Sequence, residues 1–193
     1  MKIKLFELDS DYRNYSSFLQ TNYNKLFESI HHKVLHEQKW KFFDMGKYVI
    51  PEFKLNSSDT GKKNFQHDIS ATTSPFFIFS QNAVEALKDI LEPRGQFLPI
   101  NTPSKRKKFI GYYPTNAIYG LVDLEKSGNH DLTRPFSTKN LIFRKEVKFD
   151  EYLFCIGESR SCVLITEKFK QRVEEAGLKG FDFVLPKKIV TIE

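Results

Sequence analysis

The clearest hydrophobic pattern in the chain is an apolar run at 76–79, followed by apolar residues at helical spacing over 81–91. The run predicts a buried strand, and Ser80 after it is a favoured N-cap residue. A proline and a glycine then end the predicted helix before a strand at 96–100. The apolar stripe of this helix comprises Ala83, Val84, Leu87, Ile90 and Leu91. The segment therefore predicts a strand-helix-strand unit.

A second segment near the C-terminus has the same arrangement. The apolar strand 163–165 leads through Thr166 into a predicted helix at 167–176, and a strand at 181–185 follows two glycines. Its inward face is expected to carry Phe169, Val173 and Ala176. The two segments form a weak internal repeat, and each makes a right-handed crossover if its two strands share a sheet.

Further short strands are predicted outside these units, at 2–8, 108–113, 141–144 and 152–156. The segment 152–156 is apolar on both faces, which is typical of a central strand that is covered on both sides. Runs of strands with only two clear amphipathic helices favour the α+β class. We expect a mixed or antiparallel sheet with the two helices packed on it.

The N-terminal third is less regular. Apolar residues recur at three- and four-residue steps from Tyr15 to Val34, which predicts an amphipathic helix or two short ones. Glycine, proline and polar residues dominate 41–74, which we interpret as a surface loop between short extended pieces. We expect an N-terminal helical and irregular lobe at 1–74 and an α+β domain at 75–193, or one continuous domain.

Composition and charge narrow the class of protein. With 40% hydrophobic and 28% charged residues, the 193-residue chain is globular rather than disordered. No apolar run approaches the roughly 18 residues that cross a bilayer, and acidic residues follow Met1 too closely for a signal peptide. We therefore expect a cytoplasmic protein without membrane contact. The net charge of +6 favours acidic partners.

The two cysteines, Cys155 and Cys162, show no metal-ligand spacing. If 152–156 and 161–165 form a hairpin, the cysteines are expected to lie opposite each other, where a disulfide is geometrically feasible. Reduced thiols are the default in a cytosolic protein.

A basic run lies between the predicted strands that end at Ile100 and begin near Phe109. It consists of Lys105, Arg106, Lys107 and Lys108. Four cations at the tip of a hairpin can contact phosphates or an acidic protein face, or they can form a solvated loop. Exposed loops on a rigid scaffold carry function disproportionately, so these four residues are candidates for partner binding.

Aromatic residues close to this run suggest an alternative function. Phe109, Tyr112, Tyr113 and Tyr119 can form with the cations a surface that stacks single-stranded bases. Strand alternation, however, points Phe109 and one of the two neighbouring tyrosines into the core, and no RNA-recognition or helix-turn-helix pattern is present. A nucleic-acid-binding regulator is kept as the alternative hypothesis.

Common motifs for enzymatic chemistry are absent from the sequence, and an enzyme whose site is built from scattered residues stays open as a third hypothesis. It has no phosphate-binding glycine loop, no nucleophile elbow and no paired-cysteine metal spacing. His32 and His36 have the spacing of zinc ligands on a helix, but no glutamate lies between them in the metalloprotease position, so with His31 they predict a solvated helix face. Asp123 and Glu125 would share one side of a strand, most simply a solvated edge. We expect no catalytic residues, no metal and no cofactor.

The order of several segments resembles a family of bacterial immunity proteins from polymorphic toxin systems, immunity family eleven, which was earlier catalogued as a domain of unknown function. The segments are FFIFS (76–80), AVEAL (83–87), GQFLPI (95–100), YYPTN (112–116), VDLEKS (122–127), VLITEKFK (163–170) and AGLKGFDF (176–183). The resemblance covers Trp40 to Phe183, most clearly from Phe76.

The resemblance implies a cytoplasmic binding protein, encoded beside a secreted toxin, which neutralises that toxin and protects the producing cell. The family offers no catalytic residues to transfer to this sequence. Aromatic and arginine side chains are the usual energetic anchors of protein interfaces, so Arg106, Tyr119 and Arg134 join the basic run as candidate partner-binding residues.

Overall fold

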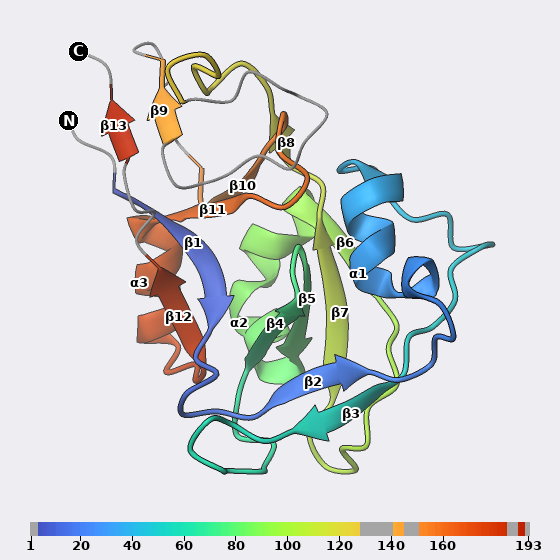
Figure 1. The fold of residues 1–193 in the computed structure, drawn as a ribbon. Coiled ribbons are helices and arrows are strands. Elements are labelled where there is room, and N and C mark those ends of the chain that lie inside the picture. The colour runs from blue at the N-terminus through green and yellow to red at the C-terminus, as the bar shows by residue number, and fades with distance from the viewer. Residues whose placement is uncertain (1–3, 128–140, 145–150, 185–188, 192–193) are drawn as a thin grey trace.

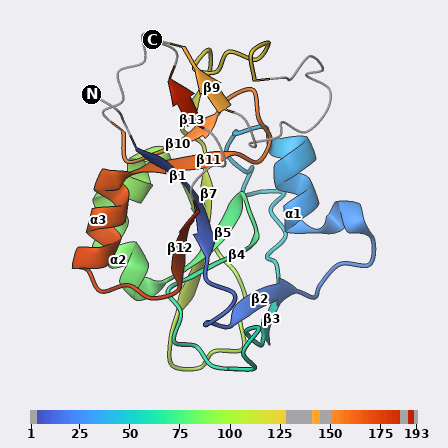
Figure 2. The same ribbon diagram turned by 60° about the vertical axis from the view of Figure 1, so that its left-hand side comes forward.

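The computed structural model describes residues 4–127, 141–144, 151–184 and 189–191, and within them the chain has the predicted α+β architecture (Figure 1). A four-stranded and a five-stranded sheet form the body, and helices α2 and α3 lie side by side (Figure 2). None of the helices in these ranges has the length and apolar character needed to cross a bilayer.

The four-stranded sheet is antiparallel and has the order β4-β5-β7-β6. Its strands are β4 (Ile69–Thr73), β5 (Phe76–Ser80), β6 (Gly95–Leu98) and β7 (Phe109–Pro114). The helix α2 (Gln81–Leu91) and the 3-10 turn η3 (Glu92–Arg94) connect β5 to β6. Ser80 caps α2 as predicted, because its side chain accepts a hydrogen bond from the amide of Ala83, and the five predicted stripe residues are buried.

The five-stranded sheet is mixed and has the order β12-β1-β11-β10-β8. Its strands are β1 (Leu5–Ser10), β8 (Ala117–Ile118), β10 (Leu153–Ile156), β11 (Val163–Thr166) and β12 (Phe181–Val184). The helix α3 (Glu167–Glu175) connects β11 to β12. Phe169 and Val173 are buried as predicted, whereas Ala176 follows the helix and is exposed, so its assignment to the inward face is wrong.

Smaller elements complete the chain. The two-stranded sheets are β2 (Ser17–Gln20) with β3 (Phe53–Asn56), and β9 (Leu141–Phe143) with β13 (Ile189–Thr191). Between β2 and β3 lie the 3-10 turn η1 (Leu26–Glu28), the short α1 (Ile30–Lys33) and the π-helical turn η2 (Val34–Gln38).

The internal repeat is visible in the topology. In one unit β5 and β6 both pair antiparallel with β7, and in the other β11 and β12 both pair antiparallel with β1. Each unit therefore holds two parallel strands that are separated by one strand from elsewhere in the chain. The two helices are joined directly by Arg172, which donates hydrogen bonds to the carboxylate of Asp89.

Two hydrophobic cores lie on opposite faces of the five-stranded sheet. In β10, Leu153 and Cys155 belong to the larger core, whereas Phe154 and Ile156 belong to the smaller one. This alternation confirms that β10 is a central strand covered on both sides. The N-terminal residues contribute to both main sheets, because β1 pairs with β11 and β12 and β4 pairs with β5.

The helix predicted to begin near Tyr15 is wrong in its first half, where the chain forms β2. The side chain of Phe18 is completely buried against Phe109 and the amide of Phe18 donates to the hydroxyl of Ser70. Its neighbour Leu19 faces outward. Tertiary hydrogen bonds and burial of alternate residues therefore override the helical spacing. The second half is helical from 26 to 38, in short turns.

The cysteine hairpin forms, but its register does not place the two cysteines face to face. Cys155 is opposite Val163, and Cys162 is the residue that precedes Val163 in the chain. Consecutive residues of a strand point to opposite faces, so Cys155 enters the larger core and Cys162 the smaller one. Both thiols are free, and burial raises the pKa of each well above its usual value. The thiols are therefore chemically inert.

Candidate partner-binding surface

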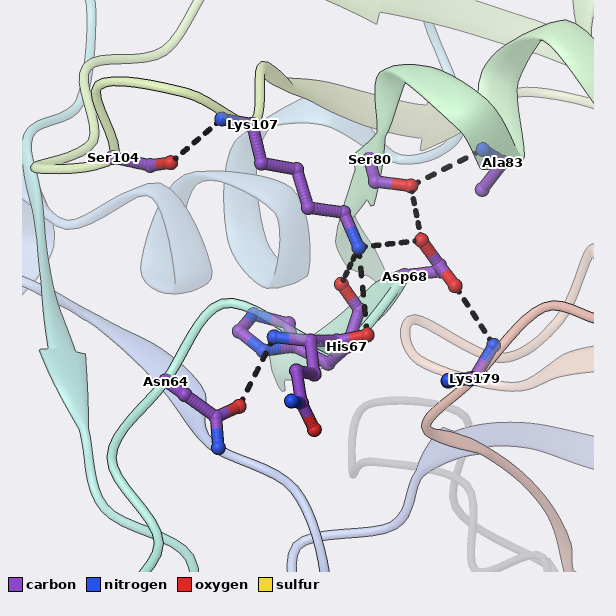
Figure 3. A network of polar contacts seen from close by, with 9 residues as sticks. Asn64, His67, Asp68, Ser80, Ala83, Ser104, Lys107 and Lys179 are labelled. Atoms are coloured by element: carbon purple, nitrogen blue, oxygen red, sulfur yellow. Dashed lines mark hydrogen bonds and ion pairs between the residues drawn. The ribbon is translucent and has the colours of Figure 1, made fainter.

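The loop between β6 and β7 carries the basic run, and one of its four cations points inward. The ammonium group of Lys107 lies 2.7 Å from a carboxylate oxygen of Asp68 and donates to the carbonyl of His67 at 2.8 Å (Figure 3). Lys107 is therefore an anchor that holds the loop to the segment before β4. Lys107 is not a free cation at the tip of the loop, and its role in partner binding stays a prediction.

Asp68 is the centre of this network. Besides Lys107, it accepts hydrogen bonds from the hydroxyl of Ser80 at 2.6 Å and from the amide of Lys179 at 2.8 Å (Figure 3). Burial opposes the charge of Asp68, but these hydrogen bonds and the charge of Lys107 outweigh it and lower the pKa of the carboxyl group. The network thus ties together the start of α2, the basic loop and the connection from α3 to β12.

The side chains of Ser80 and Lys107 both contact Asp68, and a serine, a lysine and an aspartate in this arrangement resemble a catalytic site. Ser80 is 0% exposed, and its hydroxyl is occupied in capping α2. A substrate cannot reach a nucleophile that is enclosed in this way. We therefore assign the network a structural role, in which it fixes the position of the basic loop.

Five exposed cations lie on the two loops that Lys107 connects. Lys105, Arg106 and Lys108 project from the β6–β7 loop, and Lys62 and Lys63 project from the β3–β4 loop. Within the part of the chain that the structure describes, none of the five forms an ion pair. Lys107 joins the two loops, because it also lies 3.4 Å from the carbonyl of Gln66. We call these five residues the basic surface.

The sequence interpretation missed Lys62 and Lys63, although two adjacent lysines in a polar run were a usable signal. The β3–β4 loop is also held in place, because the hydroxyl of Ser16 donates to the carbonyl of Lys62 and accepts from the amide of Asn64. Both halves of the basic surface are therefore positioned by tertiary hydrogen bonds, which reduces the entropy lost on binding a partner.

The aromatic residues next to the basic run do not form a stacking platform. Phe109 is buried, and both Tyr112 and Tyr113 are 0% exposed rather than only one of them. Their hydroxyl groups are used internally: Tyr112 donates to the carbonyl of Leu91, and Tyr113 accepts from the amide of Trp40. The basic surface therefore lacks the exposed rings that bases would need from these positions.

The remaining candidate residues lie elsewhere. Tyr119 is 64% exposed, but it follows β8, which lies at the opposite end of the molecule from the β6–β7 loop (Figure 1). Its ring lies over Gly157. Arg134 lies outside the described residues. The structure therefore does not bring Tyr119 together with the basic surface.

Gly111 and Gly157 give a matched test of how closely a buried ring, that of Phe76, and an exposed ring, that of Tyr119, pack on the backbone. A methyl group at Gly111 would lie 2.3 Å from the buried ring of Phe76, and one at Gly157 would lie 2.5 Å from the exposed ring of Tyr119. We expect Gly111→Ala to lower the free energy of unfolding by about 1–3 kcal/mol through overpacking. Gly157→Ala should cost less than about 1 kcal/mol, because the exposed Tyr119 ring can rotate away. Urea denaturation measures the free energy of unfolding of both variants. Equal losses would contradict the difference between the buried Phe76 ring and the movable Tyr119 ring.

The other polar candidates have ordinary environments. Asp123 does not share a strand face with Glu125 as expected: it caps a turn, accepting a hydrogen bond from the amide of Lys126 and pairing with its ammonium group. The rings of His32 and His36 lie 4.3 Å apart. Over the described ranges, no group of three or more potential metal ligands comes together.

An apolar surface that the sequence did not predict lies on the N-terminal segment. Eight large hydrophobic side chains within residues 19–50 are exposed: Leu19, Tyr23, Leu26, Phe27, Phe42, Met45, Val49 and Ile50. The predicted apolar stripe between Tyr15 and Val34 included the first four, but strand β2 and the η1 turn leave these four side chains exposed. Concentrations of exposed apolar residues mark interaction sites more often than single ones do.

The arrangement is therefore that of a rigid scaffold with a basic surface and a separate apolar one. Comparison with known protein families and with curated protein sequences finds no match to this chain, so its similarity to the immunity proteins remains a prediction from the sequence.

Proposed function

We propose that this chain is an immunity protein, which binds a cognate protein toxin in the cytoplasm through the basic surface and thereby blocks it. The observation that carries the proposal is the set of five exposed, unpaired cations on two loops that Lys107 holds together. The resemblance to immunity family eleven supports the class of partner.

The charge of the surface indicates what the toxin presents. Complementary potentials accelerate association and exclude partners of the same sign. A chain with a net charge of +6 that concentrates unpaired cations on two anchored loops suits a toxin with an acidic recognition face. A stable interface buries on the order of 800 Å² per partner, so the basic surface is expected to form only part of the contact.

Inhibition then needs no chemistry from this chain. A protein that covers the entrance to the toxin's active site prevents substrate from entering, and the cations are carried on loops that are anchored to the body of the fold. Because Lys107 is held by Asp68 and the carbonyl of His67, the backbone of the loop that carries the neighbouring cations loses little conformational freedom on binding.

The experiment pairs survival with binding. A susceptible bacterium expresses the toxin domain encoded by the neighbouring gene, with and without this chain, and copurification is then measured. We expect rescue and a stoichiometric complex. Reversing Lys105, Arg106 and Lys108 to glutamate should weaken binding about 100-fold, since close charge pairs across interfaces are each worth more than 1 kcal/mol.

A matched control reverses the exposed Lys39, Lys41 and Lys88, which changes the net charge equally but leaves the basic surface intact. Equal weakening by both triple variants would show that only net charge matters and would contradict the proposed surface. If the neighbouring toxin kills and this chain neither rescues nor binds, the pairing is wrong. Steeply salt-dependent DNA or RNA binding in a gel shift, lost in the first variant, would then favour the nucleic-acid alternative.

A further inference from the structure

An open hollow of about 370 Å³ lies beside β2. It is formed by β2, β3, the end of β4 and the turn that leads into α1. Its lining comprises Phe18, Leu19, Gln20, Tyr23, Leu26, Ser29, His31, Lys54, Thr72 and Thr73. Leu19 is 38% exposed, Tyr23 41% and Leu26 69%, so its apolar wall faces solvent.

The turn that carries Leu26 is held in place by hydrogen bonds. The carboxylate of Glu28 accepts from the amides of Asn24 and Lys25, and the hydroxyl of Ser29 donates to the carbonyl of Leu26 at 2.7 Å. The side chain of Gln20 accepts from the amide of Ile30 at 2.8 Å and ties the turn to β2. Because these bonds fix the turn, Leu26 is presented outward rather than folded over the hollow.

The polar part of the lining carries one sign of charge. Lys54 contributes an ammonium group, His31 contributes an imidazole, and Ser29, Thr72 and Thr73 contribute hydroxyls. No carboxylate is among the lining residues. An apolar wall beside an ammonium group suits a ligand in which an apolar side chain neighbours a carboxylate. A second copy of this basic chain is a poor occupant, because it would bring further positive charge to Lys54.

We propose that this hollow is a docking site for a segment of another protein in which apolar side chains are flanked by acidic ones. Assigning the segment to the toxin rests on the proposed function. The strand β3 supports that assignment, because Lys54 lines the hollow and the same strand leads into the loop that carries Lys62 and Lys63. An acidic partner can therefore follow β3 from the basic surface to the hollow.

Peptides test the chemistry of the hollow without the toxin. The probe is the capped hexapeptide Glu-Glu-Leu-Phe-Glu-Glu, and its matched controls are Lys-Lys-Leu-Phe-Lys-Lys and Glu-Glu-Ser-Ser-Glu-Glu. We expect the probe to shift the amide NMR signals of Leu19, Tyr23 and Leu26 and to bind at least tenfold more tightly than either control. Tyr23→Ser with Leu26→Ser should weaken its binding at least tenfold, and Val184→Ser, which alters an exposed residue outside both the lining and the apolar surface, should not.

Three results would overturn the inference. The first is equal binding of the lysine-flanked peptide, and the second is binding of the probe that shifts only the signals of the basic surface. The third is a concentration-dependent dimer in analytical ultracentrifugation that Leu26→Glu abolishes, because the occupant would then be a second copy. Thermal unfolding of each variant controls for folding.

The toxin experiment separates this inference from the proposed function. If the toxin binds and the Tyr23→Ser, Leu26→Ser variant binds it with unchanged affinity, the hollow is not part of that interface although immunity stands. If the acidic apolar peptide binds in the hollow and no toxin does, the docking chemistry stands and the proposed function fails.

Discussion

Replacing Asp68 with alanine is expected to lower the free energy of unfolding by about 3–5 kcal/mol, the usual cost of removing one partner from a buried ion pair. The carboxylate of Asp68 accepts hydrogen bonds from Lys107, Ser80 and the amide of Lys179. Its loss leaves the ammonium group of Lys107, whose side chain is only 24% exposed, without its counter-charge. Among the described residues, the ammonium group would keep the carbonyl oxygens of Gln66 and His67 as acceptors, and neither carries a full negative charge.

Urea denaturation at pH 7 measures this loss, and Asp89→Ala is the matched control. Asp89 also pairs with a cation, Arg172, but its side chain is 64% exposed, so the same substitution there should cost about 1 kcal/mol or less. Asp68→Ala should also speed amide hydrogen exchange at 105–108, because the loop loses its anchor. Equal stability losses for the two variants would show that Asp68 is not the centre of the network.

Acidification is expected to destabilise the protein through His67, by about 3 kcal/mol at pH 4. Burial, followed by the charge of Lys107, lowers the pKa of His67 from 6.5 to about 4. Among the described residues neither ring nitrogen has a hydrogen-bond partner, and the ring packs against Phe18 and Phe109. The neutral imidazole is therefore the form that the folded protein accommodates.

The direction of the change in stability with pH depends on whether the folded or the unfolded state binds more protons. Between about pH 6.5 and pH 4 the imidazole is protonated in the unfolded chain and neutral in the folded protein, so stability falls as the pH falls through this range. Below about pH 4 the folded protein also binds the proton, and this contribution stops growing. Asp68, whose pKa is lowered, adds a separate loss at pH values below 3.8.

His67→Phe isolates this effect, because a neutral ring of similar shape replaces the imidazole in an aromatic site. The variant should be at least as stable as the natural protein at pH 7 and should lose most of the pH dependence between 6.5 and 4. His67→Gln should also flatten the profile but be less stable throughout, since it buries an amide that lacks partners. Urea denaturation midpoints across this pH range measure the pH dependence of stability for each variant. An unchanged slope in His67→Phe would assign the pH dependence to other groups.

Most of the elements were predictable from local patterns. The helix α2 begins after Ser80 and ends at Leu91 as predicted, because an N-cap residue, an apolar stripe and a following proline act within one segment. The double apolar character of 152–156 likewise predicted a central strand, which β10 confirms. These signals depend on residues that are close in sequence.

The candidate site was less predictable. The sequence identified the basic run but could not tell that Lys107 turns inward, because its partners, Asp68 and the carbonyl of His67, precede it by about forty positions. The exposed side chains of Leu19, Tyr23 and Leu26 were also missed, since their spacing fitted an amphipathic helix. The segment around Phe18 forms strand β2 because Ser70 and Phe109 lie against Phe18.

The sequence by itself determined the α+β class, the repeated strand-helix-strand unit and the positions of its two helices. These follow from capping, periodicity and strand-forming runs, which are local properties. The tertiary structure decided which strand separates each parallel pair, which face each cysteine occupies and which cations remain free. These depend on register and on contacts between distant segments, where a shift of one residue moves a side chain from one core to the other.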